Sequence, residues 1–402
     1  MPAFLALIPL ITLGVAVTIV SALILLNLKA AFSLRRYVPK TALPSSSTAA
    51  GAPVSVSVIV PCKGDDGRLL SNLQTLLNQD YSDAEFVLVT ATPQDPAQAV
   101  FAQLRNSAGK WRLKTVAAGL SEHCSEKNNN LLKAVGETDP RSEVFVFLDA
   151  DGKSDRHLIS RLVAGLAESE AAAVTGNRWY EPRWGVLPEL VRTGWTAGGY
   201  CFIIDPQTSY VWGGAMALRR ETFFASGIPE IWGRTICDDM PLSFRLKELG
   251  LDVRFLPNCI VLSHEKDTWS SILAWITRQT FMTRFYHPKF FAICFVDYVL
   301  GNALGIGLFV GGLIQGSLLA TLVGFAWLAH LWLFAALIVP SLQTLVKANH
   351  PSAEFRPWVL VMAAPLAGLL QGASSIICLF TKKVRWAGVT YEVRGHTTRV
   401  LR

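Results

Sequence analysis

Residues 3–28 read AFLALIPLITLGVAVTIVSALILLNL and contain no charged side chain. A helix rises by about 1.5 Å per residue, so a segment of this length exceeds the roughly 30 Å hydrocarbon core of a bilayer. A cleaved signal peptide is the alternative, and it usually has a positively charged start, a shorter apolar core and a small-residue cleavage site. None of these features is clear here. The sequence therefore favours an uncleaved transmembrane anchor over residues 1–30.

Two further apolar blocks lie near the C-terminus. Residues 290–340 contain Asp297 as their one charged residue, and their length suits two crossings better than one. Residues 358–380 are long enough for another crossing. We therefore expect transmembrane or interfacial helices over residues 290–381. Because a charge inside a bilayer is costly, the stretch around Asp297 is the candidate for an interfacial or re-entrant segment.

Basic residues indicate how the chain is oriented in the membrane. Nothing charged precedes the first apolar segment, and it is followed by Lys29, Arg35, Arg36 and Lys40. This bias places the N-terminus outside and residues 30–289 in the cytoplasm of a bacterial inner membrane or its equivalent. Basic residues near position 382 also predict a cytoplasmic tail over residues 382–402. Three crossings would leave that tail outside, so we expect one segment not to cross.

Composition narrows the class of partner. Half of the residues (51%) are hydrophobic, 17% are charged, and the net charge is +7. We interpret the positive net charge as a means of attracting juxtamembrane residues to anionic lipid. No basic stripe interleaves with aromatic residues, so nucleic acid is not expected as a partner. The seven cysteines show no CxxC pair or metal-ligand spacing, which suits reduced thiols in a cytoplasmic domain.

The middle of the chain has the pattern of an α/β domain. Ser, Ala and Pro-rich residues within 31–53 predict a linker. From residue 54, strands rich in β-branched residues alternate with short helical patterns; the strands cover 54–62, 84–91, 111–118 and 143–150, and the helices 67–80, 95–106 and 126–137. This alternation predicts a Rossmann-like domain over residues 54–289, with a parallel sheet covered on both faces. Ligands in such sheets bind beyond the carboxyl ends of the strands.

Asp149 and Asp151 follow the buried strand VFVFL at that position. Two hard oxygen donors suit Mg²⁺ or Mn²⁺ holding a diphosphate. The metal would act as a Lewis acid on a departing nucleoside diphosphate. The alternative is a structural Asx turn or helix cap, for which Asp is also a favoured residue.

A second acidic pair, Asp238 and Asp239, precedes a helix with apolar periodicity. A carboxylate there could act as a general base that takes a proton from an acceptor hydroxyl. The alternative is N-capping of the helix, which contributes about 1 kcal/mol.

Between the two acidic pairs, residues 209–223 read SYVWGGAMALRRETF. The Gly213–Gly214 turn allows close approach of the backbone. Tyr210 and Trp212 flank the turn and could stack on the face of a sugar. A simple tight connection is the alternative.

The order of these motifs resembles membrane-bound glycosyltransferase family 2, with the A-type glycosyltransferase fold, and within it the ceramide glucosyltransferases and their bacterial relatives. The matching segments are SVIVPCKG (57–64), DPA (95–97), EKNNNLL (126–132), DAD (149–151), WGGAMALRR (212–220), DDMPL (238–242) and RWAGVTYEV (385–393). The resemblance covers about residues 54–290 and the tail. It implies inverting transfer of a sugar from a nucleotide sugar, with UDP-hexose as the donor, to the hydroxyl of a ceramide-like or other lipid.

The resemblance also implies roles for individual residues. Asp239 would be the catalytic base, and Asp151 with Asp149 would bind Mn²⁺ or Mg²⁺. Contacts to the substrates would fall on Pro61, Lys63, Gly64, Asp95, Lys127, Asp149, Trp212, Gly213, Gly214, Asp238, Trp275, Arg278 and Arg284.

Two positions depart from the family pattern. Thr92 occupies the first acidic position, with Asp95 nearby, which weakens the assignment of uracil as the base. The Gln/Arg-x-x-Arg-Trp motif best matches WITRQ (275–279), where Gln279 replaces the tryptophan. Arg278 would still offer bidentate contacts to a phosphate. Lipid headgroups are its alternative partners.

Three other functions are alternatives to a lipid glycosyltransferase. A processive polysaccharide synthase shares these motifs but needs enough crossings to form a channel. A degenerate, non-catalytic protein that binds nucleotide sugars is favoured by Thr92 and Gln279, whereas the retained Asp149, Asp151 and Asp239 argue against it. A transporter is disfavoured by the large domain with its metal motif.

Overall fold

The computed structural model describes residues 2–38, 54–107, 112–206, 208–395 and 397–401. Its central sheet has seven strands in the order β3-β2-β1-β4-β6-β5-β7. The strands are β1 (Val56–Pro61), β2 (Ala84–Thr90), β3 (Arg112–Ala117), β4 (Val144–Leu148), β5 (Ala173–Tyr180), β6 (Ala215–Arg219) and β7 (Val253–Ser263). Strands β1 to β4 are parallel to one another, which confirms the predicted α/β class.

Helices cover both faces of this sheet. They are α2 (Leu69–Leu77), α3 (Ala97–Ser107), α4 (Glu126–Gly136), α5 (Leu158–Ala167), α7 (Arg220–Ala225), α8 (Ile228–Trp232) and α9 (Asp239–Glu248). Side chains of β1 alternate between the faces: Val58 and Val60 pack with Leu73 of α2, whereas Ile59 packs with Leu131 of α4. Burial on both sides explains why the strand sequences are apolar without interruption.

Strand β6 departs from the predicted parallel sheet, because it runs antiparallel to both of its neighbours, β4 and β5. It is preceded by helix α6 (Leu187–Ile203) and the glycine turn. The Asp149 N–H donates to the Gly214 carbonyl (3.1 Å), so this turn lies at the carboxyl end of β4. A strand that starts at that edge must run back against the parallel strands.

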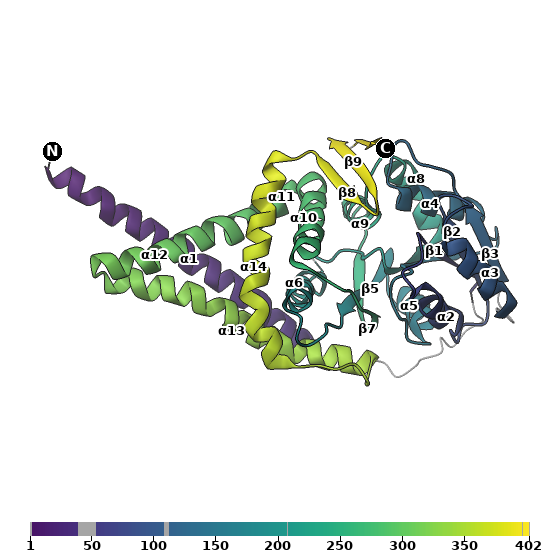
Figure 1. Ribbon diagram of the computed structural model, residues 1–402, viewed down its shortest axis with the longest axis horizontal. Coiled ribbons are helices and arrows are strands. Elements are labelled where there is room, and N and C mark those ends of the chain that lie inside the picture. The colour runs from purple at the N-terminus through teal and green to yellow at the C-terminus, as the bar shows by residue number, and fades with distance from the viewer. Residues whose placement is uncertain (1, 39–53, 108–111, 207, 396, 402) are drawn as a thin grey trace.

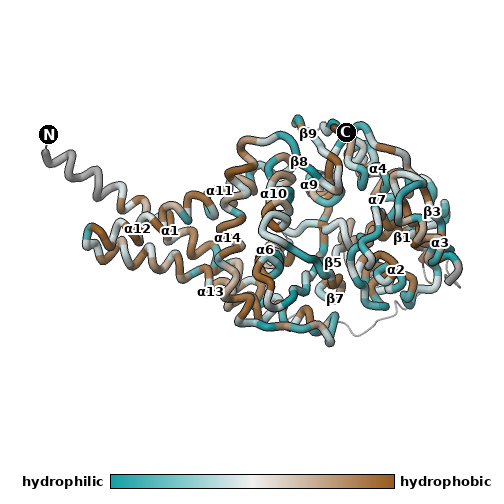
Figure 2. The backbone as a smooth tube through the Cα atoms, in the orientation of Figure 1, coloured by the Kyte–Doolittle hydropathy of each residue, from teal (hydrophilic) through white to brown (hydrophobic). Residues whose placement is uncertain are grey.

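Long helices occupy the other part of the molecule. They are α1 (Pro2–Tyr37), α11 (Pro288–Phe295), the π-helix η1 (Val296–Gly301), α12 (Asn302–Gln315), α13 (Leu318–Asn349) and α14 (Pro357–Phe380). In Figure 1, α1, α12 and α13 extend away from the globular domain, and α14 lies between them and that domain, next to α6 and α10 (Trp269–Tyr286). Four helical segments are long and apolar enough to cross a membrane, and they are predominantly hydrophobic along the tube in Figure 2.

Two expectations from the sequence differ from the structure. Helix α1 continues past residue 30 to Tyr37, because Ala31 and Leu34 are buried against the globular domain; the linker can begin only after this helix, and residues 39–53 lie outside the described part of the chain. The stretch around Asp297 lies within the consecutive helices α11, η1 and α12, which excludes a re-entrant loop, one of the two predicted alternatives. Its carboxylate accepts a hydrogen bond from Asn27 of α1 (3.0 Å).

The tail forms a three-stranded antiparallel sheet. Its strands are β8 (Lys383–Trp386), β9 (Val389–Arg394) and β10 (Thr397–Leu401). Alternating side chains, including Tyr391 and Val393, are buried against Ile236, Phe281 and Cys378. The tail is therefore packed on the globular domain, beside the loop that precedes Asp238.

Candidate active site

Asp149 and Asp151 lie immediately beyond the carboxyl end of β4, as the sequence predicts. The Asp149 side chain is 23% exposed and that of Asp151 is 49% exposed. Gly152 keeps this turn close to β7, because a Cβ atom there would lie 2.3 Å from a side-chain carbon of Val261. The two carboxylates are thus held at the sheet edge where a ligand is expected.

Arg178 of β5 joins these carboxylates and is the main residue that the sequence analysis missed. Its guanidinium donates to the Asp149 Oδ2 atom (2.8 Å) and to both oxygens of Asp151 (2.6 and 2.8 Å). The ring of Trp212 lies 4.9 Å from the guanidinium carbon. Burial raises the pKa of Asp151, but Arg178 outweighs this effect, so the pKa is lowered. A charged residue inside a buried strand was the available signal.

Lys127 of α4 connects the two acidic motifs. Its Nζ atom lies 2.9 Å from Asp149 Oδ1 and 3.0 Å from Asp238 Oδ2, and it donates to the Gly213 carbonyl (3.4 Å). Burial opposes the ammonium charge, but Asp149 and Asp238 outweigh burial and raise the pKa of Lys127. The lysine is therefore a permanently charged bridge between strand β4 and the start of α9.

Asp239 is the first residue of α9 and Asp238 precedes it. Burial, followed by the charge of Asp238, raises the pKa of Asp239 to about 6. Asp238 makes no side-chain capping hydrogen bond, so the capping alternative does not describe it. A Cβ atom on Gly213 would lie 2.0 Å from the Asp238 carboxylate. The glycine turn therefore exists because the backbone approaches this acidic pair.

Asn128 positions the loop that carries the second acidic pair. Its side-chain amide donates to the carbonyl oxygens of Trp232 (3.3 Å), Thr235 (3.1 Å) and Cys237 (3.2 Å). Because Asn128 adjoins Lys127 on α4, one helical turn both holds this loop and supplies the bridging cation. The EKNNNLL segment was predicted to contact the substrate, but this second task was not foreseen.

We call these six side chains the acidic centre: Lys127, Asp149, Asp151, Arg178, Asp238 and Asp239. It contains two more carboxylates than cations. Trp212 and the glycine turn border it. Except for Arg178, its members are predicted site residues, and the structure brings them together.

The predicted residues at the ends of β1 and β2 form a neighbouring group. Lys63 is paired with Glu126, the residue before Lys127. The Gly64 N–H donates to Asp95 Oδ1 (2.7 Å), and the same oxygen accepts from the Ala97 N–H (3.0 Å) at the start of α3. Asp95 therefore fixes the two loops to each other. Pro61 ends β1 beside them.

The three predicted residues on α10 are used differently. The Trp275 ring lies 4.4 Å from the guanidinium carbon of Arg192. Arg278 lies over the ring of Trp386 in the tail (5.1 Å). Arg284 instead donates to carbonyl oxygens at the end of α14, so the structure does not bring it to the acidic centre.

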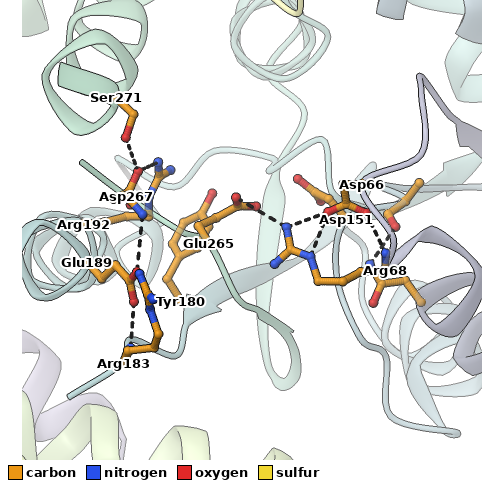
Figure 3. Close-up of polar contacts among 12 residues, drawn as sticks. Asp66, Arg68, Asp151, Tyr180, Arg183, Glu189, Arg192, Glu265, Asp267 and Ser271 are labelled. Carbon is orange, nitrogen blue, oxygen red and sulfur yellow. Dashed lines mark hydrogen bonds and ion pairs between the residues drawn. The ribbon is translucent and has the colours of Figure 1, made fainter. Parts of the chain in front are cut away.

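A cleft of about 700 Å³ lies beside this site, and two of its lining residues, Arg68 and Glu265, interact electrostatically with Asp151. Its lining is mostly charged and includes Arg68, Glu181, Arg183, His264, Glu265 and Arg356. Figure 3 shows Asp151 near Arg68, which pairs with Asp66 (2.6 Å) on one side and lies 3.7 Å from Glu265 on the other. The charged lining of the cleft therefore lies next to Asp151, at one border of the acidic centre.

Asp149 and Asp151 are the candidate ligands for a divalent cation in the acidic centre. Within the described residues, no group of three or more Cys, His, Asp or Glu side chains is arranged to hold a metal ion by itself. Mg²⁺ and Mn²⁺ sites built on one or two carboxylates, with substrate phosphates completing the shell, need no third protein ligand. Asp151 and Asp149 supply such oxygens, and the excess of carboxylates over cations suits a divalent charge. The residues therefore fit the group.

Comparison with solved structures gives distant similarities only. The mannosyltransferase PcManGT from Pyrobaculum calidifontis, in complex with GDP-Man and Mn²⁺, is 16% identical with a TM-score of 0.47, over 90% of this chain and 97% of that one. TarS residues 1–349 from S. aureus, in complex with UDP-GlcNAc, is 11% identical with a TM-score of 0.36, over 84% of this chain and 96% of that one. A mycobacterial protein is 17% identical with a TM-score of 0.36, over 60% and 78% of the two chains. The fold assignment rests on the strand order and helix layers described above.

Sequence comparison is more decisive. No curated protein matches the chain. The sequence model of glycosyl transferase family 21, however, matches residues 10–399, which is nearly the whole chain. This match confirms the expected glycosyltransferase, whereas family 2 itself is not the family that matches. The motifs of the acidic centre, the apolar helices and the tail all lie within the matched region, and the chain belongs to glycosyl transferase family 21.

Proposed function

We propose that this glycosyltransferase moves a hexose from a nucleotide sugar, with UDP-hexose as the expected donor, to the hydroxyl of a membrane lipid, with inversion at the anomeric carbon. The observation that carries the proposal is Asp239. Its pKa is raised to about 6, and it stands one residue from Asp238, which Lys127 connects to Asp149. A base with a pKa close to the operating pH is suited to accept a proton from a hydroxyl.

The acceptor step would take place at Asp239. Its carboxylate would accept the proton of the lipid hydroxyl while the oxygen attacks the anomeric carbon, and the bond to the diphosphate oxygen would break on the opposite side. Trp212 and the Gly213–Gly214 turn border this position and would orient the sugar. A half-buried carboxylate beside a second one favours the protonated product of this transfer.

The leaving nucleoside diphosphate would face the cations of the acidic centre. Lys127 and Arg178 offer charge-assisted donors for its oxygens. Mn²⁺ or Mg²⁺, held by Asp151 with Asp149, would supply Lewis-acid neutralisation of the same charge. Arg278, which has no carboxylate partner among the described residues, would contribute from α10. Pro61, Lys63 and Gly64 would line the nucleotide pocket.

A lipid acceptor is supported by the position of the apolar helices. Helix α14 packs on α6 and α10, and α10 carries Arg278. Helix α10 also packs on α9, which begins at Asp239, and this arrangement supports an acceptor that reaches the acidic centre from the membrane surface. Basic residues after α1 support a cytoplasmic position for the globular domain, residues 54–289.

The test is transfer and hydrolysis of a panel of nucleotide sugars by detergent-purified protein, with total membrane lipid as acceptor and with Mn²⁺ or EDTA. We expect metal-dependent release of a nucleoside diphosphate together with a new glycolipid, both lost in Asp239→Asn. A polymeric product would instead indicate a polysaccharide synthase. Donor binding without turnover, unchanged by the substitution, would indicate a non-catalytic binding protein.

A further inference from the structure

Helix α14 begins against the globular domain. The short connection that leads into it, after α13, is held on β7 and β5. His350 Nε2 lies 2.7 Å from the Ile260 carbonyl oxygen. The Phe355 ring stacks on Trp179, with centroids 5.1 Å apart. The N-terminal end of α14 is therefore on the domain side of the molecule.

The C-terminal end of α14 is held on the same domain. Arg284 of α10 donates to the Thr381 carbonyl oxygen (2.9 Å), directly after the helix. The tail that follows docks beside the acidic centre, where the Glu126 N–H donates to the Tyr391 hydroxyl oxygen (3.2 Å). Both ends of α14 thus lie on one side, whereas a membrane-spanning helix has its ends on opposite sides.

We propose that α14 does not cross the bilayer but lies along its surface on the side of the globular domain. The chain then crosses three times, through α1, through α11–η1–α12 and through α13. This arrangement puts the α12–α13 connection on the far side, which agrees with its position at the tip of the helices in Figure 1. It also keeps the tail on the same side as the domain on which it packs.

The two faces of α14 agree with this position. The face toward α6 and α10 contains small and apolar residues and also carries the polar side chains of the helix: Gln371 accepts from Trp195 Nε1 (2.7 Å), and Thr277 of α10 donates to the Ser374 hydroxyl (3.1 Å). The outer face is apolar and exposed, with Trp358, Met362, Leu369, Ile376 and Phe380 between 45% and 85% exposed. A row of large apolar side chains facing outward requires lipid, and the acyl–headgroup boundary supplies it to a helix lying in the surface.

The helix also lies at the base of the spanning helices. A Cβ atom on Gly372 would lie 2.7 Å from the Tyr298 carbonyl oxygen in η1. The close approach of these two backbones fixes α14 at the level where α11–η1–α12 leaves the domain. The membrane surface on this side therefore runs along α14.

Depth measurement tests the proposal on the full chain in lipid vesicles. A fluorescent bimane label would be placed on Met362→Cys, Leu369→Cys and Ile376→Cys, which are spaced by two helical turns on the exposed face. Quenching by lipids with shallow and deep nitroxides reports the depth of each label. We expect one shallow depth for all three. A spread of about 21 Å, the rise over the span of these positions, would overturn the proposal.

Helix α13 provides the matched control. Leu319→Cys, Ala326→Cys and Leu333→Cys have the same spacing on an exposed face of a helix that crosses. These labels should show the full spread of depth. If they do and the α14 labels do not, the method has resolved the difference between the two helices.

Sidedness gives a second, independent measurement. An impermeant maleimide would be added to sealed vesicles containing Ser352→Cys, before α14, or Arg399→Cys, in the tail. We expect both to react from the same side as Ser82→Cys in the globular domain, above the labelling of the native cysteines. Gln315→Cys, at the α12–α13 connection, should react only from the other side. Reaction of either Ser352→Cys or Arg399→Cys from the side on which Gln315→Cys reacts would contradict the proposal.

Discussion

In the acidic centre each cation lies between carboxylates, whereas the two arginines of α10 have no carboxylate partner among the described residues. Lys127 bridges Asp149 and Asp238 within 3.0 Å. Arg278 lies over the Trp386 ring, and its buried Nε atom makes no hydrogen bond with any described residue. Both cations of the acidic centre are already paired with carboxylates, so an anionic ligand must share or replace these pairs. Arg284 donates to carbonyl oxygens at the end of α14, whereas Arg278 keeps guanidinium donors available for an incoming anion.

We expect the largest effect from a substitution that reduces turnover without weakening donor binding. Asp239→Asn removes the proton acceptor without changing its size, and we expect turnover to fall by roughly 10²–10⁴-fold. Donor affinity, measured by equilibrium binding, should be nearly unchanged. Asp252→Asn, an exposed aspartate away from the site, is the control. Equal loss of turnover in both variants would show that Asp239 is not the general base.

Removing the bridging cation should destabilise the protein as well as inactivate it. Lys127→Met leaves buried carboxylates without their partner, which costs about 3–5 kcal/mol. Lys63→Met is the matched control, since the Lys63 side chain is 40% exposed and that of Lys127 only 15%. Thermal unfolding in detergent should show a large shift for the first variant and a small one for the second. Similar shifts would mean that the acidic centre does not depend on its lysine.

Substitution of the two arginines of α10 should have different effects on ligand affinity and on stability. Arg278→Gln removes donors that are available to a phosphate, and we expect affinity for the nucleoside diphosphate to fall by about tenfold or more at unchanged stability. Arg284→Gln removes the contacts to the end of α14 and should lower stability by about 1–3 kcal/mol at unchanged affinity. Binding and thermal unfolding of both variants measure this. The reverse pattern would refute the comparison.

The pH dependence of turnover should follow Asp239. A base must be deprotonated, so activity should rise as the pH rises through about 6 and be lost below it. The raised pKa also means that ionising this carboxyl costs stability, and this cost sets in as the pH rises from 3.8 to about 6. Asp238→Asn removes the second cause of the shift. Its acid limb should move to lower pH, and an unmoved limb would assign the titration to another group.

The smallest effect concerns the contact between the tail and α4. Tyr391→Phe removes one hydrogen bond to Glu126, worth about 0.5–1.5 kcal/mol, and should raise the KM for the donor because Glu126 adjoins Lys127 and pairs with Lys63. Tyr81→Phe removes a comparable buried hydroxyl, bonded to the Val54 carbonyl (2.8 Å). Its KM should not change. A shift in both variants would indicate a general loss of stability.

The first half of the sheet was predictable because its strands are apolar and its helices periodic. Burial on both faces leaves a pattern in the sequence itself, and β1 to β4 lie where that pattern places them. Strand β6 was not recognised because its direction depends on α6 returning the chain to the same edge. Sequence spacing contains no information about that return.

The acidic centre was predicted in its motifs but not in its pairing. Asp149, Asp151, Asp238 and Asp239 occur as conspicuous doublets, which one reading of the chain reveals. Arg178 is a single charge in a distant strand, and nothing in its neighbours specifies which carboxylates it meets. For the same reason, hydropathy identified α14 as long and apolar but could not show that its two ends are fastened to one domain.

Helices α1 and α13 have 36 and 32 residues, so they are about 54 Å and 48 Å long, well beyond the thickness of the bilayer core. Their excess length is built into the globular domain: Leu34 of α1 and Leu342 of α13 are fully buried beside Ile260 of β7. The two helices therefore fix the distance and the orientation of the acidic centre relative to the lipid surface. In a thicker membrane the globular domain would lie closer to the lipid surface. The depth at which a lipid hydroxyl reaches the acidic centre would change accordingly.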